Sequence, residues 1–131
     1  MAHQQYASCI EACTQCATEC SHCATACLQE QDVKMLARCI ALDIDCAAIC
    51  QLAAAAMARG SECAQQICAL CADICEACGD ECAKHTAMQH CQACAQACQR
   101  CADECLRMGQ QAGSQAGSTG AFDQGLLDLQ Q

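Results

Sequence analysis

Cysteine gives this sequence its chemistry, because it accounts for 20 of the 131 residues. Its thiolate is a nucleophile and a soft metal ligand. In three stretches the cysteines recur at alternating steps of four and three residues, the spacing that places side chains on one face of an α-helix. Each stretch is therefore predicted to be a helix with a row of sulfur atoms facing the inside of a bundle. The stretches comprise Cys9, Cys13, Cys16, Cys20, Cys23 and Cys27; Cys68, Cys71, Cys75, Cys78 and Cys82; and Cys91, Cys94, Cys98, Cys101 and Cys105.

Many of these cysteines form pairs separated by four residues. Such positions bring their Cβ atoms to about 5–6 Å on a helix, so that both sulfurs can be directed at one ion. Two soft thiolates in a linear or trigonal arrangement favour a soft monovalent ion, and Cu(I) is the biological one. The pairs are Cys9 with Cys13, Cys16 with Cys20, Cys23 with Cys27, Cys46 with Cys50, Cys71 with Cys75, Cys78 with Cys82, Cys94 with Cys98, and Cys101 with Cys105.

Zinc is the main competing metal. It prefers four tetrahedral ligands, commonly from CxxC knuckles in loops, whereas these cysteines fall on predicted helices. Four helices could still gather four thiolates, so a sink for zinc or another soft metal remains an alternative. Charge favours copper, because about one Cu(I) per thiolate leaves a nearly neutral interior and buried net charge is costly. The upper capacity is on the order of twenty ions, or about ten if every ion keeps its own pair.

Other cysteine chemistries fit less well. The bacterial ferredoxin run ends in Cys-Pro and the sequence has no proline, and no CxxC pair is followed by the histidine that c-type haem requires. A catalytic thiol is normally one cysteine in a distinctive electropositive setting, so no enzymatic activity is expected. A thiol-rich structural or cargo module that responds to oxidants remains a second alternative. Disulfides are not expected, since facing helices lie farther apart than easy bridging allows.

Four helices are predicted, over residues 4–29, 32–59, 61–85 and 86–108. Capping-box spacings begin at Ser8 and Thr86, Asp32 is a plausible N-cap, and Gly60 is placed to end the second helix. Short connections require antiparallel neighbours, so the fold class is all-α, an up-down-up-down four-helix bundle. The bundle domain is predicted over residues 4–108, with a flexible tail over 109–131.

The second helix carries fewer cysteines than the others. Its interior row holds Cys39, Cys46 and Cys50 and is completed by Met35, Ala53 and Met57, while Cys63 precedes the third helix. Beside the interior rows run two apolar stripes, which either fill the flanks of the bundle or form a homo-oligomer interface. These stripes are Leu36, Ile40 and Ile44, and Ile67, Leu70 and Ile74.

One end of the predicted bundle has weaker metal ligands. Continuing the cysteine rows there leads to Met35, His85 and Met88, whose thioethers and imidazole bind Cu(I) more weakly than thiolates do. This set, called the His85 end, is a predicted entry point for ions. His85 could instead interact with the helix dipole, and the methionines could simply plug the core. The opposite end carries Tyr6, Met57, Cys63 and Met108.

Charge and hydropathy limit the partners. With 15 acidic and 6 basic residues the net charge is −9, which argues against nucleic acid and anionic membrane surfaces. The first residues show no export signal, so a cytoplasmic location is expected. No uninterrupted apolar run approaches the roughly 18 residues of a membrane span.

The last part of the sequence differs from the rest. Residues 109–120 have the composition of a flexible linker. Residues 121–131 contain the single phenylalanine, Phe122, with three leucines in an acidic context, and either stay unfolded, pack weakly on the bundle or dock another protein. This layout is similar to the linker-plus-peptide tails of proteins loaded into encapsulin shells.

The repeated CxxxC motifs on four predicted helices resemble those of the bacterial copper storage proteins, in particular the cytosolic branch that lacks a leader. The resemblance covers residues 4–108. It implies a four-helix bundle that assembles as a homotetramer and holds many Cu(I) ions per chain by cysteines pointing into each bundle. The sequence thus predicts cytosolic storage and sequestration of copper.

Overall fold

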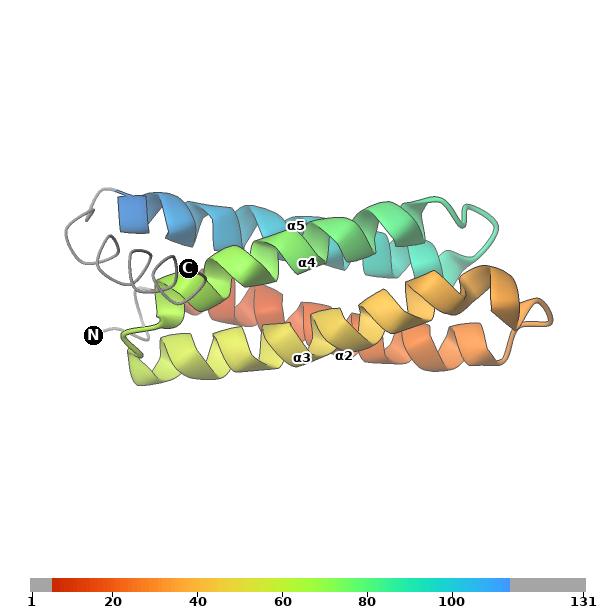
Figure 1. Ribbon diagram of the computed structural model, residues 1–131, viewed down its shortest axis with the longest axis horizontal. Coiled ribbons are helices and arrows are strands. Elements are labelled where there is room, and N and C mark those ends of the chain that lie inside the picture. Colours follow the sequence, from red (N-terminus) through yellow and green to blue (C-terminus); the bar gives the residue numbers. More distant parts are fainter. Residues whose placement is uncertain (1–5, 114–131) are drawn as a thin grey trace, which may run out of the picture.

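The computed structural model describes residues 6–113, and their side chains as far as residue 109. These residues form α2 (Ala7–Leu28), η1 (Val33–Leu36), α3 (Ala37–Arg59), α4 (Ala64–Ala83) and α5 (Gln89–Gly113). The four α-helices run alternately up and down, and each packs against two others in the order α2, α3, α4, α5 and back to α2 (Figure 1). The predicted antiparallel four-helix bundle is confirmed.

Cysteine and alanine build the interior of this bundle. The cysteine rows face inward from all four helices, and buried alanines such as Ala17, Ala53, Ala72 and Ala102 lie beside them. Burial stabilises by about 0.8 kcal/mol per methylene, and these side chains carry few. The small side chains therefore allow close helix packing while contributing less hydrophobic stabilisation than a leucine core would.

The predicted helix ends are correct at one position and wrong at another. Gly60 ends α3 in the left-handed conformation, with φ 68° and ψ 38°, and the next amide, of Ser61, donates to the Ala56 carbonyl at 2.9 Å. Ser8, in contrast, lies inside α2 and does not cap it. Its hydroxyl donates to Glu104 Oε1 on α5 at 2.6 Å, so a contact between helices replaces the expected capping box.

The start of the second helical segment corrects the expected interior row. Residues Val33–Leu36 form a 3₁₀-helix before α3 begins. Met35 is 53% exposed, whereas its neighbour Leu36 is fully buried in the core. The prediction that Met35 continues the interior row was wrong because a 3₁₀-helix has three residues per turn, so a row extended with α-helical spacing reaches the wrong side chain. Leu36 likewise leaves the apolar stripe assigned to it.

The last helix is longer than expected. The prediction ended it at Met108, but α5 continues to Gly113. Residues 114–131, which include the predicted docking segment, lie outside the described residues. The division of the chain into a bundle and a tail therefore stays a prediction.

Among the described residues, the segment Val33–Arg59 is long and apolar enough to cross a membrane by length and composition, with a mean hydropathy of 1.7 over 18 residues. The sequence contains no uninterrupted apolar run of this length, but a mean over 18 residues does not require one. This segment supplies Cys39, Cys46 and Cys50 to the buried interior. A core helix of a bundle passes the same composition test.

Gly79 marks a close approach between α4 and α5. A Cβ atom built at this glycine would lie 3.1 Å from the Cys98 Cβ and 3.5 Å from the Ala95 carbonyl oxygen. Gly109, on α5, has no such neighbour within 4 Å. A side chain at the first glycine would therefore crowd α5, while the second glycine is only a weak helix former.

We expect Gly79→Ala to lower the unfolding free energy of the reduced apo protein by about 1 kcal/mol, because crowding against Cys98 outweighs the gain in helix propensity. The matched change Gly109→Ala should raise it, by at most about 1 kcal/mol. Urea denaturation followed by circular dichroism measures both. Equal stabilisation by the two variants would contradict the close approach.

Candidate metal centre

A continuous column of thiols fills the axis of the bundle. All twenty cysteines lie within the described part of the chain, all are free, and every one except Cys63 is buried. Sulfur atoms from different helices lie in contact, at Sγ–Sγ distances from 3.2 Å between Cys39 and Cys82 to 4.0 Å between Cys46 and Cys98.

Along this column the sulfurs gather into groups of four. Within each group, one ligand atom per residue lies within 4.8 Å of all the others. Each group draws on more than one helix, so the folded bundle is needed to assemble it. From the opposite end toward the His85 end, five of these groups are Cys13, Cys71, Cys101 and Cys105; Cys16, Cys46, Cys50 and Cys75; Cys16, Cys20, Cys46 and Cys98; Cys20, Cys78, Cys94 and Cys98; and Cys23, Cys27, His90 and Cys91.

Neighbouring groups share members. Cys16 and Cys46 belong to two of them, and so do Cys20 and Cys98. Separate tetrahedral zinc sites would each need four ligands of their own. Shared sulfurs instead suit thiolates that bridge several ions of low coordination number, the preference of a soft monovalent metal. The geometry thus favours many closely spaced ions over a few isolated ones.

The predicted pairs four residues apart are only part of the contact pattern. Four of the eight are in sulfur–sulfur contact, at 3.8–3.9 Å: Cys16 with Cys20, Cys23 with Cys27, Cys46 with Cys50, and Cys71 with Cys75. The sulfurs of the other pairs contact different helices instead. Cys9 and Cys13, for example, both contact Cys105 of α5, at 3.8 and 3.7 Å. Such contacts depend on the rotation of the packed helices, which spacing along one helix does not specify.

The remaining predicted cysteine ligands occupy different environments. Cys39 and Cys82 contact each other between α3 and α4. Cys68 is buried at the opposite end of the column. Cys63 is half-buried and directly precedes α4, so it lies at the margin of the thiol column. Its assignment as a metal ligand stays a prediction.

An aspartate takes a cysteine's place in the column. Asp43 on α3 is completely buried, and its Oδ1 accepts contacts from the thiols of Cys78 at 3.1 Å, Cys94 at 3.3 Å and Cys82 at 3.6 Å. Asp43 was not among the ligands predicted from the sequence. The signal was present, because position 43 lies four residues after Cys39 and three before Cys46. An oxygen ligand therefore sits among the sulfurs.

Burial sets the protonation of this interior. Desolvation above all, together with the charge of the neighbouring Cys94 sulfur, raises the pKa of the Asp43 carboxyl to about 8. Desolvation also raises the pKa of Cys27, to about 11, and that of Cys91. Near neutral pH these three side chains accordingly favour their neutral forms, and a cation that binds them must displace protons.

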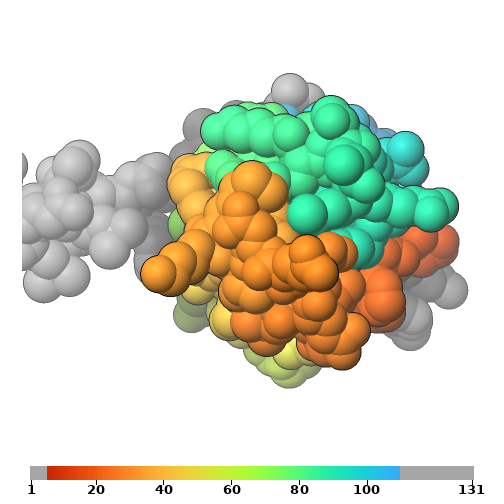
Figure 2. Space-filling view, turned by 90° about the vertical axis from the view of Figure 1, so that its right-hand side faces the viewer, coloured from red at the N-terminus to blue at the C-terminus, as the bar shows by residue number. Residues whose placement is uncertain are grey.

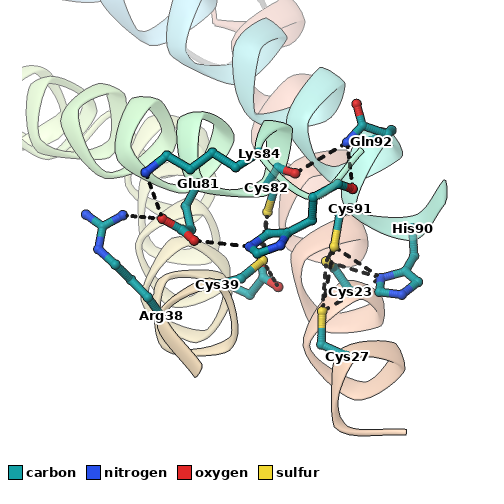
Figure 3. A network of polar contacts seen from close by, with 12 residues as sticks. Cys23, Cys27, Arg38, Cys39, Glu81, Cys82, Lys84, His90, Cys91 and Gln92 are labelled. Carbon is teal, nitrogen blue, oxygen red and sulfur yellow. Dashed lines mark hydrogen bonds and ion pairs between the residues drawn. The ribbon is translucent and has the colours of Figure 1, made fainter. Parts of the chain in front are cut away.

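His90 completes a four-ligand group near one end of the bundle. Its Nδ1 lies 3.6 Å from the sulfur of Cys91, 3.7 Å from that of Cys23 and 3.8 Å from that of Cys27 (Figure 3). His90 was not among the ligands predicted from the sequence. It lies in the first turn of α5, and its ring reaches sulfurs on α2.

His85 lies in a separate polar network at the same end. Its Nε2 is 3.1 Å from Glu81 Oε2, and the other carboxylate oxygen of Glu81 is 2.7 Å from Arg38 Nη1 and 3.4 Å from Lys84 Nζ (Figure 3). Arg38 above all lowers the pKa of the Glu81 carboxyl. Met88 is half-buried against the core. The structure thus brings His85 and Met88 to this end, while Met35 faces solvent.

The two ends of the column are closed differently. At the His85 end, the connection from α2 to α3 and the one from α4 to α5 meet over the column (Figure 2). At the opposite end, Met57 and Met108 are buried and Tyr6 packs against the core. Methionines and a tyrosine therefore close the opposite end, whereas the two histidines His85 and His90 lie at the His85 end.

Comparison with known proteins places the chain in a family. A family model described as copper storage protein matches residues 2–110. The uncharacterized cysteine-rich protein YhjQ of Bacillus subtilis (strain 168) is 55% identical over 83 residues, which are 63% of this chain and 77% of the relative.

Solved structures with the same fold include copper-bound storage proteins. The Cu(I)-bound copper storage protein BsCsp3 shares 51% identity and a TM-score of 0.75, over 83% of this chain and 99% of that one. The copper storage protein Ccsp from Streptomyces lividans, loaded with 10 copper equivalents, shares 41% identity and a TM-score of 0.78, over 82% and 85% of the two chains. With its thiol column and a family match over residues 2–110, this chain belongs to the copper storage protein family.

Proposed function

We propose that this protein stores and sequesters many Cu(I) ions in the thiol column of its bundle and catalyses no reaction. The observation that carries this proposal is the set of buried four-ligand groups that share sulfurs along the bundle axis. The Cu(I)-bound structure of BsCsp3 and the copper-loaded Ccsp support the same cargo. Copper is thus the cargo that the protein stores.

Charge balance accounts for the expected capacity. Each Cu(I) that binds a buried thiol displaces one proton, so the charge of the core changes little at about one ion per thiolate. A divalent ion bound by four thiolates would leave about two negative charges in an interior that lacks water. The column therefore accommodates monovalent ions more readily.

A cytosolic location follows from the same chemistry. Thiols stay reduced in the cytoplasm, and a reduced column is what copper binding requires. One of the solved relatives is described as a cytosolic copper storage protein from Streptomyces lividans. We propose the same compartment for this chain.

The decisive measurement of function is anaerobic titration of the reduced protein with Cu(I) against a chromophoric competitor. We expect uptake of well over ten ions per chain, because nearly all of the twenty thiols line one column. Total thiol and metal analyses serve as controls. Uptake of four or five ions, with zinc preferred over Cu(I), would contradict copper storage and support the zinc alternative.

We also propose that ions enter and leave at the His85 end. Its nitrogen and thioether groups, from His85, His90 and Met88, hold Cu(I) less tightly than thiolates and can pass ions inward. Met35 is exposed there and could make a first contact. The cysteines then serve as the storage ligands.

For this entry route, we expect His85→Ala combined with Met88→Ala to slow loading by substoichiometric Cu(I) and to leave the total capacity nearly unchanged, since all cysteines remain. Stopped-flow absorbance of the copper–thiolate band measures the rate. Met108→Ala, at the opposite end, is the control. If only the control variant loads slowly, ions enter at the other end.

We further propose that the chain assembles as a homotetramer through the outer faces of α3 and α4. Ile44 is 59% exposed on α3 and Leu70 is 51% exposed on α4, while Ile40, Ile67 and Ile74 are half-buried beside them. The interior is occupied by sulfur, so these apolar side chains gain burial only from a partner.

We expect Ile44→Glu combined with Leu70→Glu to reduce the particle mass measured by light scattering, because two charges would have to be buried at the contact. Leu28→Glu, a change at a similarly exposed leucine at the end of α2, should leave the mass unaltered. A wild-type protein that is monomeric at micromolar concentration would overturn the assembly.

A further inference from the structure

The imidazole of His90 is held from both sides. Its Nδ1 faces the three sulfurs of Cys23, Cys27 and Cys91, while its Nε2 lies 3.2 Å from Glu30 Oε1. The His90 side chain is 15% exposed and that of Glu30 is 39% exposed. The ring thus lies between a solvent-facing carboxylate and the buried thiols.

The contact with Glu30 selects one form of the ring. An ionised carboxylate only accepts hydrogen bonds, so Nε2 must carry the hydrogen in this contact. In the neutral imidazole the lone pair then belongs to Nδ1, the atom that faces the sulfurs. A metal ion can bind only the nitrogen that has a lone pair. The two sides of the ring are therefore coupled.

We propose that Glu30 is a positioning residue, which orients the His90 ring and fixes the tautomer whose Nδ1 is free to bind an ion held by Cys23, Cys27 and Cys91. This inference rests on the proposed function, because the ion concerned is stored Cu(I). Carboxylates that accept the second ring N–H of a metal-binding histidine tune the affinity of such sites.

The backbone of Glu30 is hydrogen-bonded to a residue of the same site. It follows the end of α2, and its backbone amide donates to the carbonyl of Cys27 at 3.1 Å. The turn that holds the carboxylate is therefore bonded to the residue that supplies one of the sulfurs. Residues from the end of α2 and the start of α5, 60 positions apart, are joined in one small unit.

The other histidine–carboxylate pair at this end differs. Glu81 is shared among His85, Arg38 and Lys84, so two cations already compensate its charge. Among the described residues, the Glu30 carboxylate is paired with His90 alone, and the polar contacts of His85 involve Glu81 and not a sulfur. Positioning of a ligand is accordingly assigned to Glu30, whereas the buried Glu81 joins a network of ion pairs.

A nearby acid provides a matched control. His90 lines a groove between α2 and α5 together with Thr18, Glu19, His22, Gln89 and Ala93. Glu19 places a carboxylate in this groove without a hydrogen bond to His90. Removing Glu19 alters the local charge but leaves the contact with Nε2, so it separates the electrostatic effect from the hydrogen bond.

The direct test is ¹⁵N NMR of the imidazole nitrogens in the reduced, metal-free full chain, with His90→Gln used to assign the signals. In the wild type we expect a protonated Nε2 and an unprotonated Nδ1. Glu30→Ala should give a mixture of the two tautomers, and Glu19→Ala should match the wild type. Glu30→Gln should retain the wild-type form, because its amide oxygen accepts the same hydrogen bond. An unchanged tautomer in Glu30→Ala, or an equal change in Glu19→Ala, would overturn the proposal.

A second measurement reports on the bound ion. In fully loaded protein, we expect Glu30→Ala to weaken the binding of about one ion per chain by roughly 10- to 100-fold in chelator competition, with total capacity retained. Glu30→Gln should restore most of this affinity. Retention of every ion at wild-type affinity would overturn the role in copper binding. If the wild type bound no Cu(I), the proposed function would fail, whereas the tautomer measurement would still test Glu30.

Discussion

Contact between sulfur atoms along the bundle axis is the interaction on which the rest of this structure depends. Sγ atoms from α2, α3, α4 and α5 approach one another to less than 4 Å at most levels of the column. Thiols are small, so such contacts require helices that pack closely. Alanines beside the cysteine rows and Gly79 facing Cys98 provide that closeness. The same geometry that fills the core also assembles groups of four soft ligands.

A core of cysteine and alanine offers many metal ligands but less hydrophobic stabilisation than a core of large aliphatic side chains. Methylene groups are few in a cysteine and alanine interior, so burial stabilises it less than a leucine core. Ions that bind only the folded bundle add stability through mass action. The polar groups are few and specifically placed. Asp43 lies among thiols at a pKa of about 8, and His90 closes a group of three sulfurs.

Helix periodicity explains what the sequence predicted well. A residue type that recurs every three or four positions specifies both a helix and its inward face, so the four helices and the buried thiols were predicted from spacing. Gly60 was identified because a left-handed helix end favours glycine. The class of metal followed from the ligand type, and the family match over residues 2–110 agrees with it.

The features that were missed depend on departures from that periodicity or on packing between helices. Leu36 lies in the core and Met35 is exposed, because a 3₁₀-helix precedes α3. Asp43 fits the row by position, but its residue type did not suggest an interior site. His90 lies off the row, and only the packing of α5 against α2 brings its ring to three sulfurs. Glu30 is 60 residues away from His90, beyond any local pattern.

Because the four-ligand groups share cysteines, the protein can tolerate the loss of single ligands. A protein with one metal site loses its activity when a single ligand is oxidised or mutated. Here Cys16, Cys20, Cys46 and Cys98 each belong to two groups, so the sulfurs form a chain of overlapping sets. Losing one sulfur leaves its neighbours with other partners on adjacent helices. Capacity should therefore decline in small steps as cysteines are lost, and natural variants could differ in cysteine number while keeping the same fold and cargo.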